Sequence, residues 1–275
     1  MDSLLLTIKI GIDPEIGRIG GLLLTWHGVF IALAIGLGVW LGVWFGRRAG
    51  FTEDDAYTAA LIAVPAGIIG ARALFVAENW DLFSDDWLDI FRINEGGISL
   101  YGSLVFGVAA ALAYGFWRRL PILKGLDAAS FGMILGQGIG RIGCLVAGDI
   151  FAKSSDLPFS VVYTNVNSLS FARPPMHFVT AYEVIGDFLI LGVLFGLWKF
   201  RIFKRDGLLF FIYAFLYSAM RFGISFLRVD KEIAVGLGMA QLIALAVIAV
   251  SVVAFAAYAY VALRRPPAPK SEAAA

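Results

Sequence analysis

The 275-residue sequence has little of what a soluble or metal-binding protein needs. Charged residues make up only 16% of the chain, which contains one cysteine and two histidines. A single cysteine excludes an internal disulfide, and two histidines without a Cys/His cluster disfavour a structural zinc site, so we expect no metal and no cofactor. A net charge of +1 gives no indication of a nucleic-acid partner, and we expect none.

Apolar residues are abundant instead. They make up 60% of the chain and give a mean hydropathy of +0.82. Several stretches are long enough to cross a bilayer, which takes about 20 residues of helix. We therefore predict an all-α polytopic membrane protein with seven transmembrane helices. The expected spans are residues 22–46, 56–77, 98–117, 126–147, 178–198, 207–227 and 236–262.

Basic residues are distributed unevenly on the two sides of these spans. Twelve Lys and Arg residues fall in the loops after the odd-numbered spans and in the tail, and seven fall on the other side. Because cytoplasmic loops carry the excess of positive charge, we expect the N-terminus outside and the C-terminus in the cytoplasm. The N-terminal segment is expected to lie at the membrane surface.

We expect one membrane-embedded domain over residues 1–263 and a disordered cytoplasmic tail over residues 264–275, which are too polar and proline-rich to pack. The loop at about 148–177 is the longest on the outer side and is predicted to form a small cap. Its segment FSVVYTNV has the β-branched and aromatic composition of a short strand.

The stretch GMILGQGIGRIGCLVAGD organises the chain. Gly132, Gly136, Gly140 and Cys144 recur every fourth residue, which predicts a flat helix face that a neighbouring backbone can approach closely. Arg141 lies on the same helix, and an arginine at membrane depth costs about 2.5 to 3.5 kcal/mol, so it normally faces a partner, a cavity or a ligand. The helix is therefore expected to aim one charge inward.

Embedded polar residues gather at the outer ends of the predicted spans. Arg72 and Arg141 lie late in outward-running spans, and Arg221 belongs to a stripe of polar residues with four-residue spacing. Only Glu183 and Asp187 oppose these arginines at that depth. Two interpretations remain open. The charges form ion pairs that fix helix register, or they bind an anion, for which the guanidinium fork suits phosphate.

Several single residues allow both a structural and a functional interpretation. His27 and His177 are interfacial or packed histidines, or catalysts. Cys144 continues the small helix face, so we interpret it as a packing residue rather than a nucleophile. Tyr217 stands one turn before an embedded arginine on the polar stripe. The glycine-rich EGGISLYGS, residues 95–103, is expected to turn the chain back into the membrane next to a site.

Six segments share motifs with one known family. GRIGCLVAGD matches much of the pattern G-R-x-G-N-F-x-N-G-E, TWHG is similar to W-Y-G, and EGGISLYGSLVFG is similar to G-G-x-S-x-H-G-G-x-x-G. MHFVTAYE is similar to H-P-S-Q-L-Y-E, YSAMRFGISFLR to Y-x-x-x-R followed by E-F-x-R, and GLGMAQLIAL to a closing S-M-G-Q segment. Over nearly the whole chain, and in the order in which they occur along it, the six segments resemble the bacterial prolipoprotein diacylglyceryl transferase family.

The resemblance implies an enzyme of the bacterial inner membrane that transfers diacylglyceryl from phosphatidylglycerol to the lipobox cysteine thiol of an exported prolipoprotein, forming a thioether and releasing glycerol 1-phosphate. Its partners would be phosphatidylglycerol, the prolipoprotein signal peptide and membrane lipids. The alternative is a diverged relative that binds or moves anionic phospholipid in the outer leaflet without transfer. The candidate catalytic residues are Arg141, Arg221, His27, Tyr101 and Tyr217. The candidate substrate-binding residues are Arg72, Gly102, Cys144, Asp149, His177, Glu183 and Arg228.

The sequence departs from the family pattern at several of these positions. Four departures place Cys144 at an asparagine, Asp149 at a glutamate, Ser103 at a glycine and Ser225 at a glutamate position. In addition, His27 and Tyr101 exchange the family's tyrosine and histidine. If both line one cavity, His27 is the base, because an imidazole accepts a thiol proton at neutral pH whereas a phenol donates a hydrogen bond. Independent drift, which leaves no base, is the other interpretation.

Overall fold

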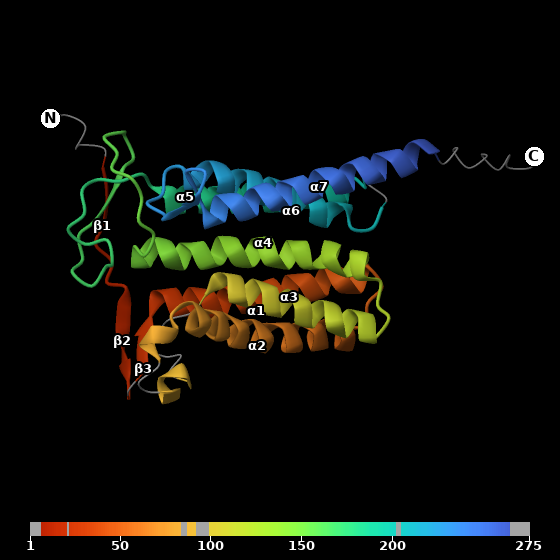
Figure 1. Ribbon diagram of the computed structural model, residues 1–275, viewed down its shortest axis with the longest axis horizontal. Coiled ribbons are helices and arrows are strands. Elements are labelled where there is room, and N and C mark those ends of the chain that lie inside the picture. Colours follow the sequence, from red (N-terminus) through yellow and green to blue (C-terminus); the bar gives the residue numbers. More distant parts are fainter. Residues whose placement is uncertain (1–6, 21, 84–86, 92–98, 202–204, 265–275) are drawn as a thin grey trace, which may run out of the picture.

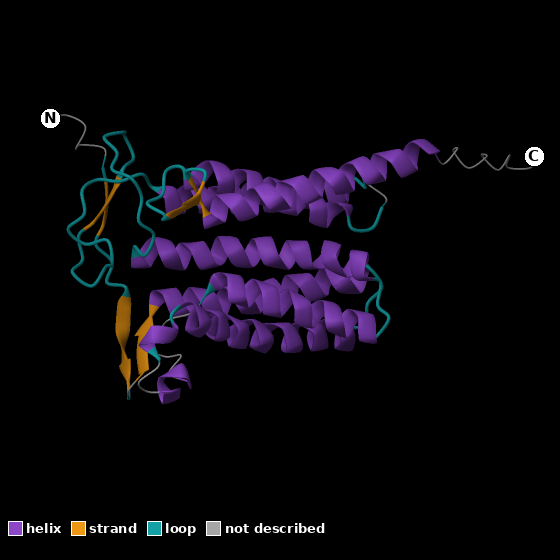
Figure 2. Cartoon of the chain, viewed as in Figure 1, coloured by secondary structure: helices purple, strands orange, loops and turns teal. Residues whose placement is uncertain are grey.

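In the described part of the chain, seven α-helices run side by side in a bundle, and the strands gather at one end of it (Figure 1, Figure 2). The computed structural model describes residues 7–20, 22–83, 87–91, 99–201 and 205–264. We call the end where α1 begins, next to the strands, the strand end. The helices are α1 (Trp26–Arg48), α2 (Glu53–Glu78), α3 (Leu100–Trp117), α4 (Ile122–Ala147), α5 (Val179–Lys199), α6 (Leu208–Ser225) and α7 (Met239–Arg264).

Length and composition suit these helices to a membrane. Among the described helices, six are long and apolar enough to cross one, and α3 contributes a shorter apolar stretch, Val105–Trp117. The prediction of an all-α polytopic membrane protein is thus confirmed. The helix boundaries lie within a few residues of the expected spans. The predicted tail from residue 265 onward lies outside the described residues.

The first helix begins at Trp26, which corrects the expected start at residue 22. The hydroxyl of Thr25 accepts a hydrogen bond from the backbone N–H of Gly28 at 3.1 Å, so Thr25 caps the helix. The residues before it form β3 (Leu22–Thr25), which pairs antiparallel with β2 (Glu15–Ile19). The apolar residues of β3, which were predicted to begin the first span, are therefore extended, because their backbone groups pair with β2.

Helix α4 lies at the centre of the bundle, between α1 on one side and α5 and α6 on the other (Figure 1). The predicted flat face of α4 is confirmed, since it packs on α1. A Cβ on Gly132 would clash with the carbonyl oxygen of Gly38, and one on Gly136 would lie 3.2 Å from the carbonyl oxygen of Ala34. Small residues are needed here because the two backbones touch.

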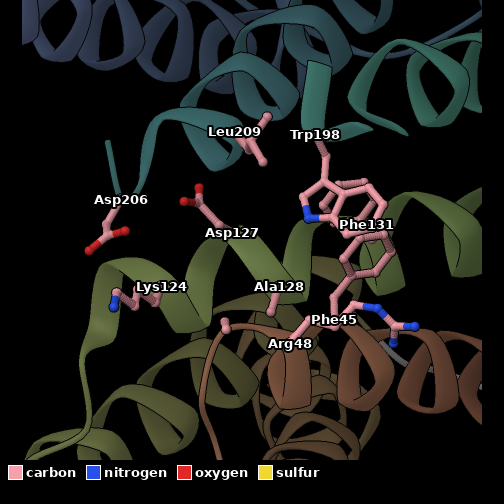
Figure 3. A pocket seen from close by; sticks show the side chains of 10 residues that line it. Phe45, Arg48, Lys124, Asp127, Ala128, Phe131, Trp198, Asp206 and Leu209 are labelled. Atoms are coloured by element: carbon pink, nitrogen blue, oxygen red, sulfur yellow. The ribbon is translucent and has the colours of Figure 1, made fainter. Parts of the chain in front are cut away.

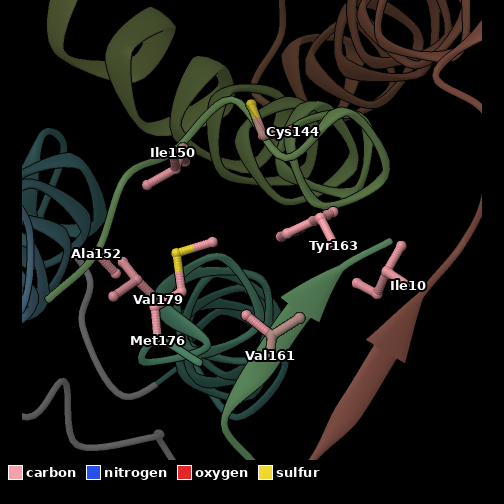
Figure 4. Packing of buried hydrophobic residues seen from close by; sticks show 8 residues of the cluster. All are labelled: Ile10, Cys144, Ile150, Ala152, Val161, Tyr163, Met176 and Val179. Atoms are coloured by element: carbon pink, nitrogen blue, oxygen red, sulfur yellow. The ribbon is translucent and has the colours of Figure 1, made fainter. Parts of the chain in front are cut away.

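Residues 148–178 form a cap over the strand end. The strand predicted in FSVVYTNV is confirmed as β4 (Val161–Tyr163), which pairs in parallel with β1 (Ile8–Ile10). A second hairpin, β5 (Glu232–Ala234) with β6 (Leu237–Gly238), precedes α7. An apolar cluster joins the cap to the helices (Figure 4) and consists of Ile10, Cys144, Ile150, Ala152, Val161, Tyr163, Met176 and Val179. The cap is therefore part of the packed core.

Candidate active site

Glu183 on α5 is the centre of an arginine cluster at the strand end of the bundle. Its Oε2 lies 2.9 Å from Nε of Arg141 on α4, and its Oε1 pairs with Nη1 of Arg221 on α6. Nη1 of Arg228, which follows α6, lies 3.8 Å from the same Oε1. One carboxylate is thus shared by guanidiniums from three segments of the chain.

Burial makes this sharing costly unless every charge has a partner. Glu183 is 1% exposed, whereas the side chains of Arg141 and Arg221 are 19% and 16% exposed. Each guanidinium carries five N–H donors, and one carboxylate can accept only some of the ten that these two arginines offer. The arginines therefore keep donors and some accessible surface for a further anionic group.

Asp187 lies one turn after Glu183 and is equally buried, at 1% exposed. Neither of its carboxylate oxygens accepts a hydrogen bond from the described residues. Gly138 on α4 faces it, because a Cβ there would lie 3.4 Å from Cβ of Asp187. Of the two acids predicted at the depth of the arginines, only Glu183 forms ion pairs with them within the described residues.

The polar stripe predicted on α6 faces the interior of the bundle. The hydroxyl of Tyr213 donates to Oε1 of Gln137 on α4 at 3.1 Å, and its ring stacks on Tyr217 with centroids 6.1 Å apart. Arg221 and Ser225 continue the stripe, and the Ser225 hydroxyl donates to the backbone carbonyl of Arg221 at 2.8 Å. The stripe holds α6 against α4 and directs the guanidinium to the carboxylate on α5.

A second cluster joins three more of the predicted residues. Nδ1 of His27 lies 3.4 Å from Oδ2 of Asp149. One donor atom each from His27, Cys144 and Asp149 lies within 4.8 Å of the others. Burial raises the pKa of Asp149 above its ordinary range, and the neighbouring His27 opposes this shift. Asp149 is therefore placed to orient the imidazole that sequence analysis named as the base.

Glycines at the end of α4 make this cluster possible. A Cβ on Gly143 would lie 3.2 Å from Cα of His27, so glycine lets the start of α1 come close. Helix α4 is capped by Gly148, which has a left-handed φ of +67° and packs where a Cβ would come 2.8 Å from the Tyr163 ring. The hydroxyl of Ser170 in the cap donates to the Gly148 carbonyl at 2.6 Å. The cap thereby fixes the turn that presents Asp149.

Two predicted substrate-binding residues make other contacts. Arg72 donates to the backbone carbonyls of Asp89 at 2.5 Å and Ile90 at 2.8 Å, rather than to Glu183. A Cβ on Gly102 would clash with the carbonyl oxygen of Gly70, so this glycine allows α3 to pack on α2. The family position of Gly102 thus coincides with a helix contact, which the loop motif did not reveal.

Other predicted residues are placed only in part. The side chain of Tyr101 and residues 92–98, which include part of EGGISLYGS, lie outside the described residues, so a cavity shared by Tyr101 and His27 stays a prediction. His177 is half-buried just before α5, and its backbone N–H donates to the Lys153 carbonyl at 3.1 Å. Asp230 was not among the predicted residues, although its carboxylate lies 3.0 Å from Nε of Arg228; only the two-residue spacing of this pair suggests it in the sequence.

A cavity of about 290 Å³ lies at the opposite end of the bundle (Figure 3). It is lined by Phe45, Arg48, Ala49, Lys124, Asp127, Ala128, Phe131, Trp198, Asp206 and Leu209. The carboxylate of Asp127 accepts hydrogen bonds from the N–H groups of Gly207 and Phe210, at 2.6 and 2.8 Å, and so caps α6. None of the candidate residues lines this cavity, so we assign the chemistry to the strand end.

Fold and site together define a polytopic membrane protein with an internal arginine cluster at one end. The family model for prolipoprotein diacylglyceryl transferase matches residues 14–257. A phosphatidylglycerol–prolipoprotein diacylglyceryl transferase of Dehalococcoides mccartyi is 34% identical over 248 residues, which cover 90% of this chain and 94% of the relative. One from Clostridioides difficile is 32% identical over 225 residues, covering 82% and 87%. The chain belongs to the prolipoprotein diacylglyceryl transferase family.

Proposed function

We propose that this protein transfers diacylglyceryl from phosphatidylglycerol to the lipobox cysteine thiol of exported prolipoproteins. In this reaction the sulfur forms a bond to the glyceryl carbon, the bond from that carbon to the phosphate oxygen breaks, and glycerol 1-phosphate leaves. The names of the relatives support the reaction. They do not favour the alternative, a protein that only binds or moves lipid.

The observation that carries the proposal is the arginine pair on Glu183. Arg141 and Arg221 approach one carboxylate from two helices, and their remaining donors suit the phosphate of the lipid. Negative charge grows on the leaving oxygen as the carbon–oxygen bond breaks. Fixed guanidiniums stabilise that charge most where water is excluded. Arg228 lies close enough to support the pair, and Tyr217 lies one turn before Arg221 on the same face of α6.

The thiol must lose its proton to attack, and His27 is the proposed base. Asp149 contacts Nδ1 of the ring, which leaves Nε2 to accept the proton when that nitrogen is unprotonated. We assign Asp149 as a positioning residue, because it acts through the imidazole. Cys144 keeps its interpretation as a packing residue of the cluster beneath the cap.

We infer that the strand end faces the outer side of the bacterial inner membrane, with the C-terminus in the cytoplasm. The basic loops that follow α1, α3 and α5 lie together at the opposite end, which supports this orientation. Phosphatidylglycerol would then enter from the outer leaflet, and the prolipoprotein would present its cysteine at the same level.

Alanine at Arg141 or Arg221 tests the proposal. Each variant should transfer diacylglyceryl to a lipobox peptide about 100- to 1000-fold more slowly, the usual effect of removing one preorganised electrostatic group. Lysine should rescue poorly because it lacks the guanidinium fork. Arg48→Ala, at the opposite end, is the control and should keep its activity. Near-normal transfer by either alanine variant, or failure of the wild-type gene to complement a strain depleted of its own transferase, would contradict the proposal.

A further inference from the structure

The cluster of His27, Cys144 and Asp149 has a composition that catalysis by a histidine base does not require. A base needs an imidazole and a carboxylate that orients it. Here a free, buried thiol stands beside them, with donor atoms of all three residues within 4.8 Å of one another. These are a nitrogen, a sulfur and an oxygen donor, from the start of α1 and from the end of α4 with the turn that follows it.

We propose that His27 Nδ1, Cys144 Sγ and a carboxylate oxygen of Asp149 bind one divalent transition-metal ion of the zinc class. Zinc binds nitrogen, oxygen and thiolate ligands at about 2.0 to 2.3 Å, which places neighbouring ligands of a tetrahedral site about 3.5 Å apart. His27 Nδ1 and Asp149 Oδ2 already lie 3.4 Å apart. Sγ of Cys144 lies within 4.8 Å of the other two donor atoms, so the cluster must contract around Cys144 to reach this spacing.

Two of the donor atoms would give up no hydrogen bond, because the one close contact of His27 Nδ1, with Oδ2 of Asp149, lies within the cluster itself. Nδ1 of His27 and Oδ1 of Asp149 are buried and form no hydrogen bond with the described residues. Such orphaned atoms normally cost free energy, and a metal ion satisfies both. Charge also balances, because a thiolate and a carboxylate neutralise a divalent ion, while the nearby Arg141 is paired with Glu183.

The backbone around the cluster is fixed before any ion arrives. Gly143 seats the start of α1 on the end of α4, and the cap holds Gly148 in the turn that presents Asp149. A site carried on packed helix ends loses little conformational freedom on binding. With three protein ligands, one position stays open to water or to a thiol, as in zinc sites that are not purely structural.

Metal binding has a consequence for the proposed base, and this step rests on the proposed function. A neutral imidazole that binds a metal through Nδ1 carries its proton on Nε2. Nε2 of His27 can then no longer accept the thiol proton. The ion should therefore inhibit diacylglyceryl transfer by occupying the ring nitrogen that otherwise faces Asp149.

Cobalt(II) is the probe for this site, because its bond to a thiolate gives a charge-transfer band in the near ultraviolet. The chain has one cysteine, so any such band reports on Cys144. Titration of the purified full chain in detergent should give the band at one ion per chain. Zinc should displace cobalt, and millimolar magnesium should not, because magnesium prefers oxygen ligands.

Variants locate the ligands. Cys144→Ser should abolish the band while preserving the small helix face. His27→Ala and Asp149→Asn should each weaken cobalt binding by more than about tenfold, since even outer partners of a metal site contribute 10- to 100-fold. His177→Ala removes the only other histidine and should leave binding unchanged.

Absence of the band in the wild-type protein, or binding that His27→Ala and Asp149→Asn leave intact, would overturn the site. The wild-type titration needs no variant to fold, so absence of the band there is sufficient to reject the site. Inhibition is measured separately. Cobalt binding without loss of transfer would remove His27 as the base and leave the metal site standing.

Discussion

Replacing Glu183 by glutamine should weaken the fold and strengthen anion binding at the same time. The variant removes the carboxylate that Arg141 and Arg221 share and leaves both guanidiniums in a buried site. Breaking a buried ion pair by removing one partner costs about 3 to 5 kcal/mol. For a chain of this size, the midpoint of thermal unfolding should fall by on the order of 10 °C. Glu53→Gln is the control, because it breaks a solvent-exposed pair with Arg47 worth at most about 1 kcal/mol.

An anionic ligand should restore much of this loss. Glycerol 1-phosphate can replace the missing carboxylate between the two arginines, and a ligand present at 100 times its dissociation constant stabilises a protein by about 2.7 kcal/mol. Scanning fluorimetry in detergent, with and without the ligand, should therefore show a larger upward shift for Glu183→Gln than for the wild-type protein. Unchanged unfolding of the variant, or equal shifts in the two proteins, would show that Glu183 does not hold the arginines for phosphate.

Three further predictions concern the second cluster. Cys144→Ser should keep diacylglyceryl transfer in metal-free buffer, whereas Cys144→Leu should cost about 1 to 3 kcal/mol through overpacking, as seen in thermal unfolding; loss of transfer by a folded serine variant would assign the thiol a role in the reaction. His27→Ala should abolish most transfer, Tyr101→Phe should reduce it moderately, and the exchange of His27→Tyr with Tyr101→His should recover more activity than either change alone; full activity of His27→Ala would favour drift. Because burial raises the folded-state pKa of Asp149, the native state binds more protons there than the unfolded chain, so its contribution to stability falls as pH rises through the raised pKa. Asp149→Asn mimics the protonated acid and should therefore stabilise the metal-free protein at neutral pH, with the advantage shrinking toward about pH 4, near the ordinary pKa; an advantage independent of pH would contradict this.

The helix bundle was predictable because each membrane span is a long run of apolar residues in the sequence. The glycine ladder of α4 predicted a close helix contact, and the structure confirms it at Gly132 against Gly38. The start of α1 was not predictable in the same way. Leu22 to Leu24 are as apolar as the residues of the span, and only their pairing with β2 makes them extended. Hydropathy measures how strongly side chains avoid water, and it does not distinguish a paired strand from a helix.

The site was predictable in part for a related reason. Depth in the membrane follows from position along a span, so Arg141, Arg221 and Glu183 could be placed at one level from the sequence. Rotation about the helix axis, however, decides which charges meet. Arg72 shares their level by position along its span, yet it bonds to the backbone carbonyls after α2. The contact between His27 and Asp149 depends on the packing of α1 on α4 and on the turn at Gly148. No local sequence motif predicts either feature.

The shared carboxylate also bears on how the protein is made. Helices enter the membrane in chain order, so α4 arrives with Arg141 before α5 brings Glu183 and before α6 brings Arg221. Until then the lone arginine costs about 2.5 to 3.5 kcal/mol in lipid. Helix α5 relieves that cost, and the late arrival of α6 completes the cluster. During biogenesis, a chain interrupted after α4 therefore holds Arg141 in the bilayer without the carboxylate that pairs with it in the finished protein.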